Sequence, residues 1–288
     1  MSGEESRNRL WNEIHESFRE FVLPEDNQKI LKANLRVLRT EYRSMNNSSL
    51  SPRFSSKDMR DAYMVAYHPG HAYLSHNVLC RISEELAYQE QKNYTVTVLG
   101  AGCAAEILAF LQWAITRESV CEKVTVNLVD VQDWTAQRKI GLFPLVNDYL
   151  ESGFLEIISF QTDVCSSNGR ELINQLVPQS NLVITPALFT ELTDDCRNKL
   201  FDLVLKALNP TGLLLIMDQS EVSEFRPWIE NKSKHVGKIA VIALEDLVRR
   251  VPGPPIWLRE QVLDGTDGLI PRSKYKWTWM LCMARHHL

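Results

Sequence analysis

The residues best placed to do chemistry begin with a glycine-containing turn. Gly100, Ala101 and Gly102 come directly after an apolar run at 94–99 and directly before a helical pattern, in the sequence VTVLGAGCAAE. Glycine at such a strand-to-helix turn permits a tight bend and lets a ligand approach the backbone. The turn therefore predicts a ligand site, with a tight turn that binds nothing as the structural alternative.

Acidic residues follow the next two predicted strands. The second strand ends in Asp130, with Val131 after it, and the third is followed by Asp163 and Val164. An acid after the second strand can accept hydrogen bonds from both hydroxyls of an adenosine ribose. Asp163 could accept a hydrogen bond from the adenine amino group while Val164 packs on the ring. These positions predict a nucleoside site at the carboxyl edge of a parallel sheet.

Three further side chains are candidates for catalysis: Tyr67, His71 and Glu191. Tyr67 and His71 lie in the sequence YHPGHAYLSH, which holds three of the seven histidines. An imidazole with a pKa near neutrality can act as a base or orient a substrate. Glu191 follows the fourth predicted strand, where it could face the substrate or serve only to cap the helix that begins near Thr193.

Neither the histidines nor the cysteines predict a metal site. No carboxylate or thiol joins the histidines, and Pro69-Gly70 is expected to precede a new helix, so that the histidines do not share one helical face. The six cysteines include no C-x-x-C spacing. We therefore expect no metal, and reduced thiols in a cytoplasmic or nuclear protein.

The elements that position these residues change in character along the chain. Helical patterns occupy residues 1–90, which we interpret as a cap on the substrate side, and residues 91–288 form the predicted core. In the core, short apolar runs alternate with helical patterns, which predicts an α/β, Rossmann-like, doubly wound and mostly parallel sheet. The expected strands are 94–99, 123–130, 154–160, 181–187, 212–217, 237–244 and 275–284, with helices at 104–117, 134–150, 168–176 and 194–208.

Composition limits the choice of partner. The net charge is −4 and the pI is about 6.0, so no overall basic field attracts nucleic acid or an anionic membrane. No apolar run approaches the ~20 residues of a membrane helix. A basic stripe from Lys29 to Arg43 is interpreted as a solvated helix face, with an acidic partner or RNA as the alternative.

Together, these residues and the order of the elements resemble the class I S-adenosylmethionine-dependent methyltransferase family over about residues 60–288. The resemblance implies that Gly100 and Gly102 hold the methionine moiety, Asp130 the ribose and Asp163 the adenine. Ala101, Val131, Val164 and Pro186 complete the expected cofactor-binding set. It also implies a seven-stranded sheet with an antiparallel last strand, and a helix over 63–86 that covers the cofactor.

The resemblance also restricts the methyl acceptor. Family members that methylate exocyclic base amines carry Asp or Asn, two prolines and an aromatic residue after the fourth strand, whereas this chain has the sequence TPALF at 185–189. We therefore expect methyl transfer to oxygen or nitrogen of a small molecule or a protein, and nucleic acid is not favoured. The resemblance does not name the oligomeric state.

Several alternatives stay open. Val98 replaces an acid common in the family and Ala104 replaces its third glycine, which would suit a binding protein or scaffold that no longer catalyses. Part of the sequence also resembles a ribosome-assembly methyltransferase-like family, which would imply an RNA or ribosomal role. An NAD-dependent dehydrogenase is disfavoured because its ribose acid lies ~20 residues after the glycines, whereas Asp130 lies 28 residues after Gly102.

Overall fold

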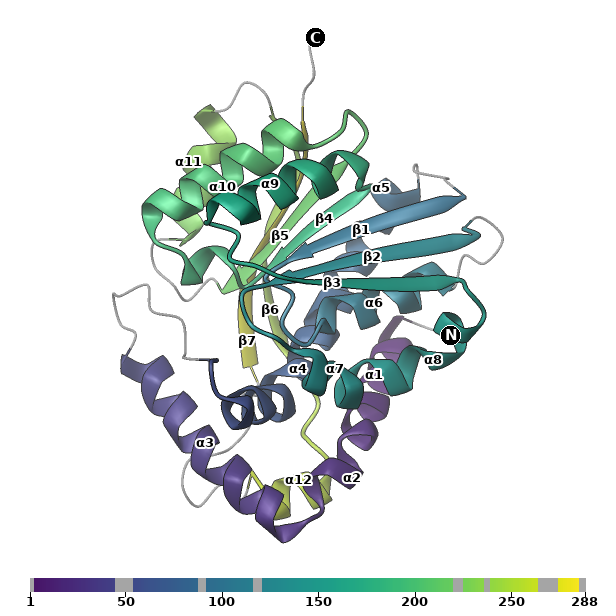
Figure 1. Cartoon of the computed structure of the whole chain (residues 1–288), viewed down its shortest axis with the longest axis vertical. Helices are drawn as coiled ribbons and strands as arrows, with labels where there is room; N and C mark the ends of the chain where they lie inside the picture. The colour runs from purple at the N-terminus through teal and green to yellow at the C-terminus, as the bar shows by residue number, and fades with distance from the viewer. Residues whose placement is uncertain are drawn as a thin grey trace.

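The computed structural model describes residues 3–44, 54–87, 92–115, 121–219, 225–235, 239–263 and 274–284. Its centre is one seven-stranded sheet in the order β3-β2-β1-β4-β5-β7-β6 (Figure 1). The strands are β1 (Asn93–Leu99), β2 (Lys123–Asp130), β3 (Leu155–Gln161), β4 (Leu182–Pro186), β5 (Leu213–Gln219), β6 (Ile239–Arg250) and β7 (Lys274–Ala284).

The strand directions confirm the predicted fold class. Strands β1 to β5 pair in parallel, and β7 pairs antiparallel with both β5 and β6. The first two strands, NYTVTVL and KVTVNLVD, are rich in β-branched residues and almost fully buried, as expected for strands covered on both faces. Because β1 is followed by β2 on one side and β4 lies on the other, the strand order reverses between β1 and β4.

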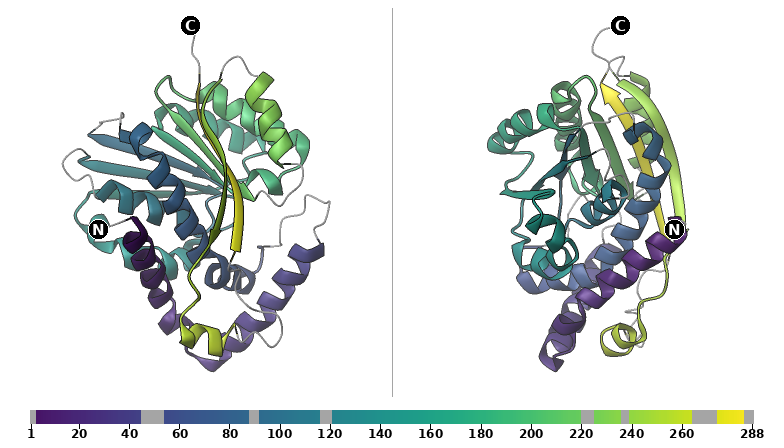
Figure 2. Two further views of the ribbon diagram at one scale, coloured as in Figure 1. Left: turned by 180° about the vertical axis from the view of Figure 1, so that it is seen from behind. Right: turned by 90° about the vertical axis from the view of Figure 1, so that its right-hand side faces the viewer.

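Helices cover both faces of this sheet (Figure 2). One face packs against α4 (Lys57–Arg81) and α6 (Ala105–Ile115), and α1 (Gly3–Ser17) and α3 (Glu25–Ser44) pack in turn on α4. The other packs against α9 (Ser167–Leu176), α10 (Asp194–Ala207) and α11 (Phe225–His235). The remaining helices are α2 (Arg19–Val22), α5 (Ser83–Ala87), α7 (Thr135–Gly141), α8 (Phe143–Glu151) and α12 (Ile256–Gln261), with short 3₁₀ turns η1 (Val177–Gln179) and η2 (Phe189–Glu191).

Helices α1, α2 and α3 form a V at the bottom of Figure 1. The V closes at Pro24, which lies between α2 and α3. The apolar stripe of α3 is buried at Leu31, Leu35 and Leu38. None of the described helices has the length and apolar character needed to cross a membrane.

Two predicted helix boundaries are wrong. Helix α4 does not begin after Pro69-Gly70 but runs through both residues from Lys57 to Arg81. The second half of α4 is buried on nearly every side, and this packing outweighs the backbone hydrogen bond that proline removes. The helix expected at 134–150 is divided into α7 and α8 at Leu142, next to Pro144, which occupies an early position of α8.

Candidate functional site

A pocket lies at the carboxyl edge of the sheet, where the strand order reverses between β1 and β4. Its walls come mainly from the segments that follow four parallel strands, which is where ligands bind in open α/β sheets. Its volume is about 180 Å³, below the roughly 300–1,000 Å³ of pockets that enclose a whole ligand. The described walls therefore hold part of a ligand of cofactor size.

Most of the residues singled out from the sequence meet in this pocket. Its lining includes Gly100, Gly102, Asp130, Val131, Asp163, Val164, Pro186 and Glu191. Ala101, Tyr67 and His71 are not among the lining residues. The lining also includes Tyr63, from the region expected to cover the cofactor, and residues to which the sequence assigned no role: Phe54, Gln132, Ala187, Leu188 and Leu192.

The turn after β1 has the backbone conformation for which glycine is suited. Gly100 and Gly102 have positive φ angles of 75° and 48°, and Ala104 adopts 65° despite its side chain. A Cβ atom on Gly100 would lie 3.0 Å from Cδ1 of Leu188, whereas one on Gly102 would meet nothing closer than the Trp134 ring at 4.0 Å. The backbone is thus covered by Leu188 at Gly100 and accessible at Gly102.

Asp130 faces this turn and is held by three donors. Its Oδ2 accepts a hydrogen bond from the Gly102 amide at 2.8 Å. Its Oδ1 accepts from the Gln132 amide at 2.9 Å and from Trp134 Nε1 at 3.0 Å. A carboxylate offers about four acceptor positions, so the carboxylate can still accept from a ligand hydroxyl while its orientation is fixed by the protein.

Arg138 also binds the glycine turn after β1, a role that the sequence did not predict. Its Nε donates to the Gly102 carbonyl at 3.0 Å, and its Nη1 donates to Ser159 Oγ at 2.9 Å. Burial lowers the pKa of Arg138, and the nearby Asp130 carboxylate opposes that change. In the sequence this arginine is one cation in an amphipathic helix, so no local signal distinguishes it from a solvated residue.

Asp163 and Val164 line the pocket from the loop after β3. The carboxylate of Asp163 is exposed and accepts a hydrogen bond from the Cys165 amide at 2.8 Å, while Val164 is buried. Gly169 makes this arrangement possible, because a Cβ atom there would lie 2.0 Å from the Asp163 carbonyl oxygen. Helix α9 can therefore start directly against the loop that presents these two residues.

The expectation that all cysteines are reduced is wrong for one pair. Cys165 and Cys196 form a disulfide that joins the loop after β3 to the first turn of α10. Cys80, Cys103, Cys121 and Cys282 are free thiols. The pairing was not apparent in the sequence because the two cysteines are 31 residues apart and meet only through the fold.

Aromatic side chains form the wall nearest α4. The Tyr63 ring lies 4.8 Å from that of Phe54 and 5.9 Å from that of Trp134, measured between centroids. Tyr67 stacks on Tyr63 at 5.0 Å, and His71 meets Tyr63 edge-on at 6.0 Å. Tyr67 and His71 therefore stand behind the pocket wall, and a direct catalytic role for either stays a prediction.

His71 also approaches a buried acid. Its Nδ1 lies 3.9 Å from Oε1 of Glu106, in the first turn of α6. Burial raises the pKa of Glu106 to about 7. His68 and His71 do lie on the same helix, contrary to the expectation, but within the described residues no three potential metal ligands come together.

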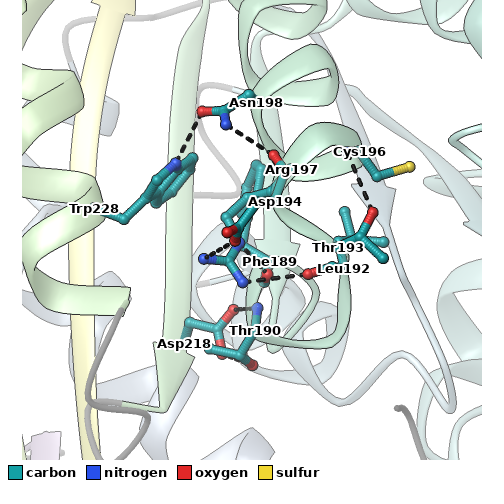
Figure 3. A network of polar contacts seen from close by, with 10 residues as sticks. All are labelled: Phe189, Thr190, Leu192, Thr193, Asp194, Cys196, Arg197, Asn198, Asp218 and Trp228. Atoms are coloured by element: carbon teal, nitrogen blue, oxygen red, sulfur yellow. Dashed lines mark hydrogen bonds and ion pairs between the residues drawn. The ribbon is translucent and has the colours of Figure 1, made fainter. Parts of the chain in front are cut away.

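Glu191 enters the pocket from η2, the short turn that follows β4. The turn ends at Leu192. Helix α10 begins where the sequence predicted, but its N-cap is Thr193, which accepts a hydrogen bond from the Cys196 amide, rather than Glu191. Figure 3 shows the polar groups packed around this turn, among them Thr190, Arg197 and Asp218. Pro186 and Ala187 lead into the turn, and Ala187 has a positive φ of 48°.

The lining has a clear electrostatic character. It contains three carboxylates, those of Asp130, Asp163 and Glu191, and its described members include no lysine, arginine or histidine. Apolar and aromatic groups make up most of the rest. Such a site favours a ligand with positive charge and hydroxyl or amine donors, and disfavours a phosphate-bearing ligand.

Comparisons with known proteins agree with this fold. No protein-family model matches the sequence, and no curated protein is similar enough to match it. Among solved structures, an O-methyltransferase family protein from Burkholderia thailandensis aligns over 89% of this chain and 71% of its own, with a TM-score of 0.51 and 13% identity.

Two other solved structures align with lower scores. The plantazolicin methyltransferase BpumL, in complex with SAH, covers 94% of this chain and 99% of its own with a TM-score of 0.44 and 13% identity. A precorrin-6y C5,15-methyltransferase from Geobacter metallireducens covers 70% and 85% with a TM-score of 0.39 and 9% identity. From the strand order and the first of these similarities, the chain has the Rossmann-like fold found in methyltransferases.

Proposed function

We propose that this protein binds S-adenosylmethionine and transfers its methyl group to an oxygen or nitrogen acceptor on a small molecule or a protein. The observation that carries the proposal is the composition of the pocket at the strand-order reversal. There, an accessible glycine turn and three carboxylates face one cavity whose described lining contains no basic side chain. The fold similarity supports the same assignment.

The charge of the pocket distinguishes this cofactor from a dinucleotide. S-adenosylmethionine carries a sulfonium and an ammonium group, which surrounding carboxylates stabilise, whereas the pyrophosphate of NAD is anionic and would be repelled by them. The carboxylate of Asp130 is positioned to accept from a ribose hydroxyl, and Gly102 leaves room for the amino-acid part of the ligand. These features disfavour the dehydrogenase alternative.

Methyl transfer from this cofactor depends more on positioning the acceptor than on activating the methyl group. The bound cofactor supplies an electrophilic methyl group, so alignment of the acceptor with it can provide much of the rate enhancement. Within the chain, Asp130 and the glycine turn hold the cofactor, and the aromatic wall of Tyr63 and Phe54 excludes water. Glu191 is the carboxylate on the acceptor side that can receive a proton if the acceptor must lose one.

The absence of the residue pattern typical of base-amine methylation supports a small-molecule or protein acceptor. The end of β4 and the residues after it read Pro186-Ala187-Leu188 and place an aliphatic side chain against Gly100. Sequence 1–90 is proposed as the substrate-side cap on the core formed by 91–288, because Phe54 and Tyr63 from the cap line the pocket.

Calorimetric titration with S-adenosylhomocysteine tests the cofactor assignment. We expect binding by the wild type, and Asp130→Asn should weaken it by roughly 10-fold to 100-fold, the effect of losing a hydrogen bond to a charged group. Asp148→Asn on the exposed surface of α8 is the matched control and should bind as the wild type does. Binding of NAD in place of S-adenosylhomocysteine would overturn the assignment.

A second experiment addresses transfer. Protein and methyl-labelled S-adenosylmethionine would be incubated with separate small-molecule, protein and RNA fractions, and the label followed into each. We expect label in the small-molecule or protein fraction. Cofactor binding with no transfer to any fraction would instead support the non-catalytic scaffold.

A further inference from the structure

The turn η2 forms the wall of the pocket that lies against the glycine turn. Leu188, at its start, would contact a Cβ atom placed on Gly100, and Glu191, at its end, lines the cavity. Under the proposed function, this wall faces the methionine moiety and the acceptor, whereas Asp130 and Asp163 face the adenosine. The position of η2 thus decides the shape of one half of the site only.

Asp218 accepts hydrogen bonds from the amide and the hydroxyl of Thr190, in the middle of this turn. It lies near the end of β5, is fully buried, and belongs to neither the glycine turn nor the pocket lining. Its Oδ1 accepts a hydrogen bond from the Thr190 hydroxyl at 2.6 Å, and its Oδ2 accepts from the Thr190 amide at 3.0 Å. Two bonds from one residue to a buried carboxylate fix both the position and the rotation of η2 relative to the sheet.

Arg197 binds backbone carbonyl groups at the two ends of the same turn. From α10, its Nε donates to the Phe189 carbonyl at 2.8 Å and its Nη2 donates to the Leu192 carbonyl at 3.2 Å, so one guanidinium spans the two ends of the turn (Figure 3). The side chain is 5% exposed, lies 3.4 Å from an oxygen of Asp194, and packs over the Trp228 ring at 5.6 Å.

A buried arginine and a buried aspartate therefore bind the same short turn, the arginine through carbonyl groups and the aspartate through the amide and hydroxyl of Thr190. Each charged group makes two hydrogen bonds to the turn or to the residue that ends it, so the turn is the element that both of them order. A surface turn that only connected β4 to α10 would not require two desolvated charges, because desolvating an ion costs free energy that only its new partners offset.

We infer that Asp218 and Arg197 are positioning residues that set the methionine and acceptor side of the pocket by fixing η2, and with it Leu188 and Glu191. This inference rests on the proposed function for its ligands, and it deepens that function by separating two halves of the site. The adenosine half is held by the loops after β2 and β3, and the acceptor half by this charged clamp.

The decisive variant removes one bond of the clamp without removing a charge. Thr190→Val keeps the shape of the side chain and the amide bond to Asp218 but deletes the hydroxyl donor, and Thr190→Ser keeps the hydroxyl as the matched control. Calorimetric affinities would be measured for adenosine and for S-adenosylhomocysteine. We expect Thr190→Val to weaken S-adenosylhomocysteine by roughly tenfold, the effect of one charged hydrogen bond, with adenosine unchanged and Thr190→Ser like the wild type.

A second variant and a ligand-free measurement keep the test decisive. Arg197→Lys retains the charge but lacks the planar guanidinium that spans Phe189 and Leu192. It should likewise weaken the affinity for S-adenosylhomocysteine and leave the affinity for adenosine unchanged. Hydrogen exchange would be followed for a peptide covering 187–193, with a peptide covering 123–130 as the internal reference. Thr190→Val and Arg197→Lys should speed exchange in the first peptide and leave the second unchanged.

Each outcome has a distinct meaning. Equal loss of both ligands, or no change in either ligand or in exchange, would overturn the clamp. If the wild type bound no S-adenosylhomocysteine, the proposed function would fail, and the exchange data alone would decide whether Asp218 and Arg197 order the turn.

Discussion

The two faces of the sheet hold their buried polar groups in different ways. On the face covered by α4 and α6, four buried groups, His15, His68, His76 and Glu106, have pKa values that burial moves toward the neutral form. On the face covered by α9 to α11, the buried arginine and aspartate of the η2 clamp are bound by complementary groups. The pocket lies at the edge shared by both faces.

Because of this difference, the two faces should affect different properties: the first the stability of the protein, the second the shape of the pocket. Because burial favours the neutral form of the four groups on the first face, a change of pH alters the protons bound by the folded and unfolded states unequally. The second face holds its charges against specific donors and acceptors that shape the pocket. We therefore expect pH to act on the stability of the protein chiefly through the α4 side, and substitutions in the η2 clamp to act on ligand affinity.

The largest expected effect is a loss of stability in acid. Burial, the main cause, lowers the pKa of each of the three histidines to about 4 from a usual value of 6.5. As the pH falls through 6.5, the unfolded chain takes up protons that the folded chain does not, so the free energy of unfolding decreases until about pH 4. For the fully buried His68 alone, the decrease is on the order of 3 kcal/mol.

Urea unfolding across this pH range measures the effect. His68→Gln keeps a donor for the Gly141 carbonyl, which His68 Nε2 contacts at 3.3 Å, but removes the titrating ring. The stability advantage of the wild type over this variant should shrink between pH 7 and pH 4.5. A constant difference over that range would show that His68 does not contribute to the acid sensitivity.

Glu106 should act in the opposite direction. Its pKa is raised by burial to about 7 from 4.5, so between these values the folded chain keeps a proton that the unfolded chain loses. Rising pH therefore lowers the free energy of unfolding, by an amount on the order of 3 kcal/mol that is complete above pH 7.

The comparison of Glu106→Gln with the wild type isolates this contribution. The variant should gain stability relative to the wild type as the pH rises from 5 to 8, with the gain read from urea midpoints. Glu122→Gln, at an exposed position, is the control and should show no such trend. If Glu106→Gln behaved like the control, the pairing of Glu106 with His71 would have to stabilise the ionised acid fully.

The smallest expected effect concerns backbone strain beside the glycine turn. Ala104 has a φ of 65°, which costs a non-glycine residue about 1 kcal/mol. Ala104→Gly should therefore raise the free energy of unfolding by up to ~1 kcal/mol. The neighbouring Ala105→Gly, in the first turn of α6, should lower it by ~0.5–1 kcal/mol. Thermal melts of the two variants should shift in opposite directions, and equal shifts would contradict the strain at Ala104.

Much of the core was predictable because its signals are local. The β-branched runs and the glycines and acids that follow them mark the strands and their carboxyl ends, and the parallel topology then brings Gly102, Asp130 and Asp163 to one edge. Glu191 and Pro186 follow from the same logic. These residues share a pocket because their positions depend on strand ends, which the sequence marks clearly.

The rest depended on contacts between distant segments. Pro69 led us to expect a helix boundary because the rule that proline interrupts helices does not take into account the packing that keeps α4 continuous. Tyr63 reaches the pocket from a helix outside the βα units, and Arg197 and Asp218 carry no motif at all. The roles of Arg197 and Asp218 arise from desolvation and from partners 5 to 28 residues away in sequence, which periodicity does not encode.

The place of β7 in the sheet has a consequence for the order in which the molecule can form. Strand β7 lies between β5 and β6 although it follows both in the chain, so β6 has no neighbour in the sheet until β7 has emerged from the ribosome. All four loops that build the pocket precede β5. A nascent chain can thus form the edge that carries the pocket early. The β5 edge of the sheet then stays unpaired until β7 and β6 are added, and we expect a chaperone to protect it.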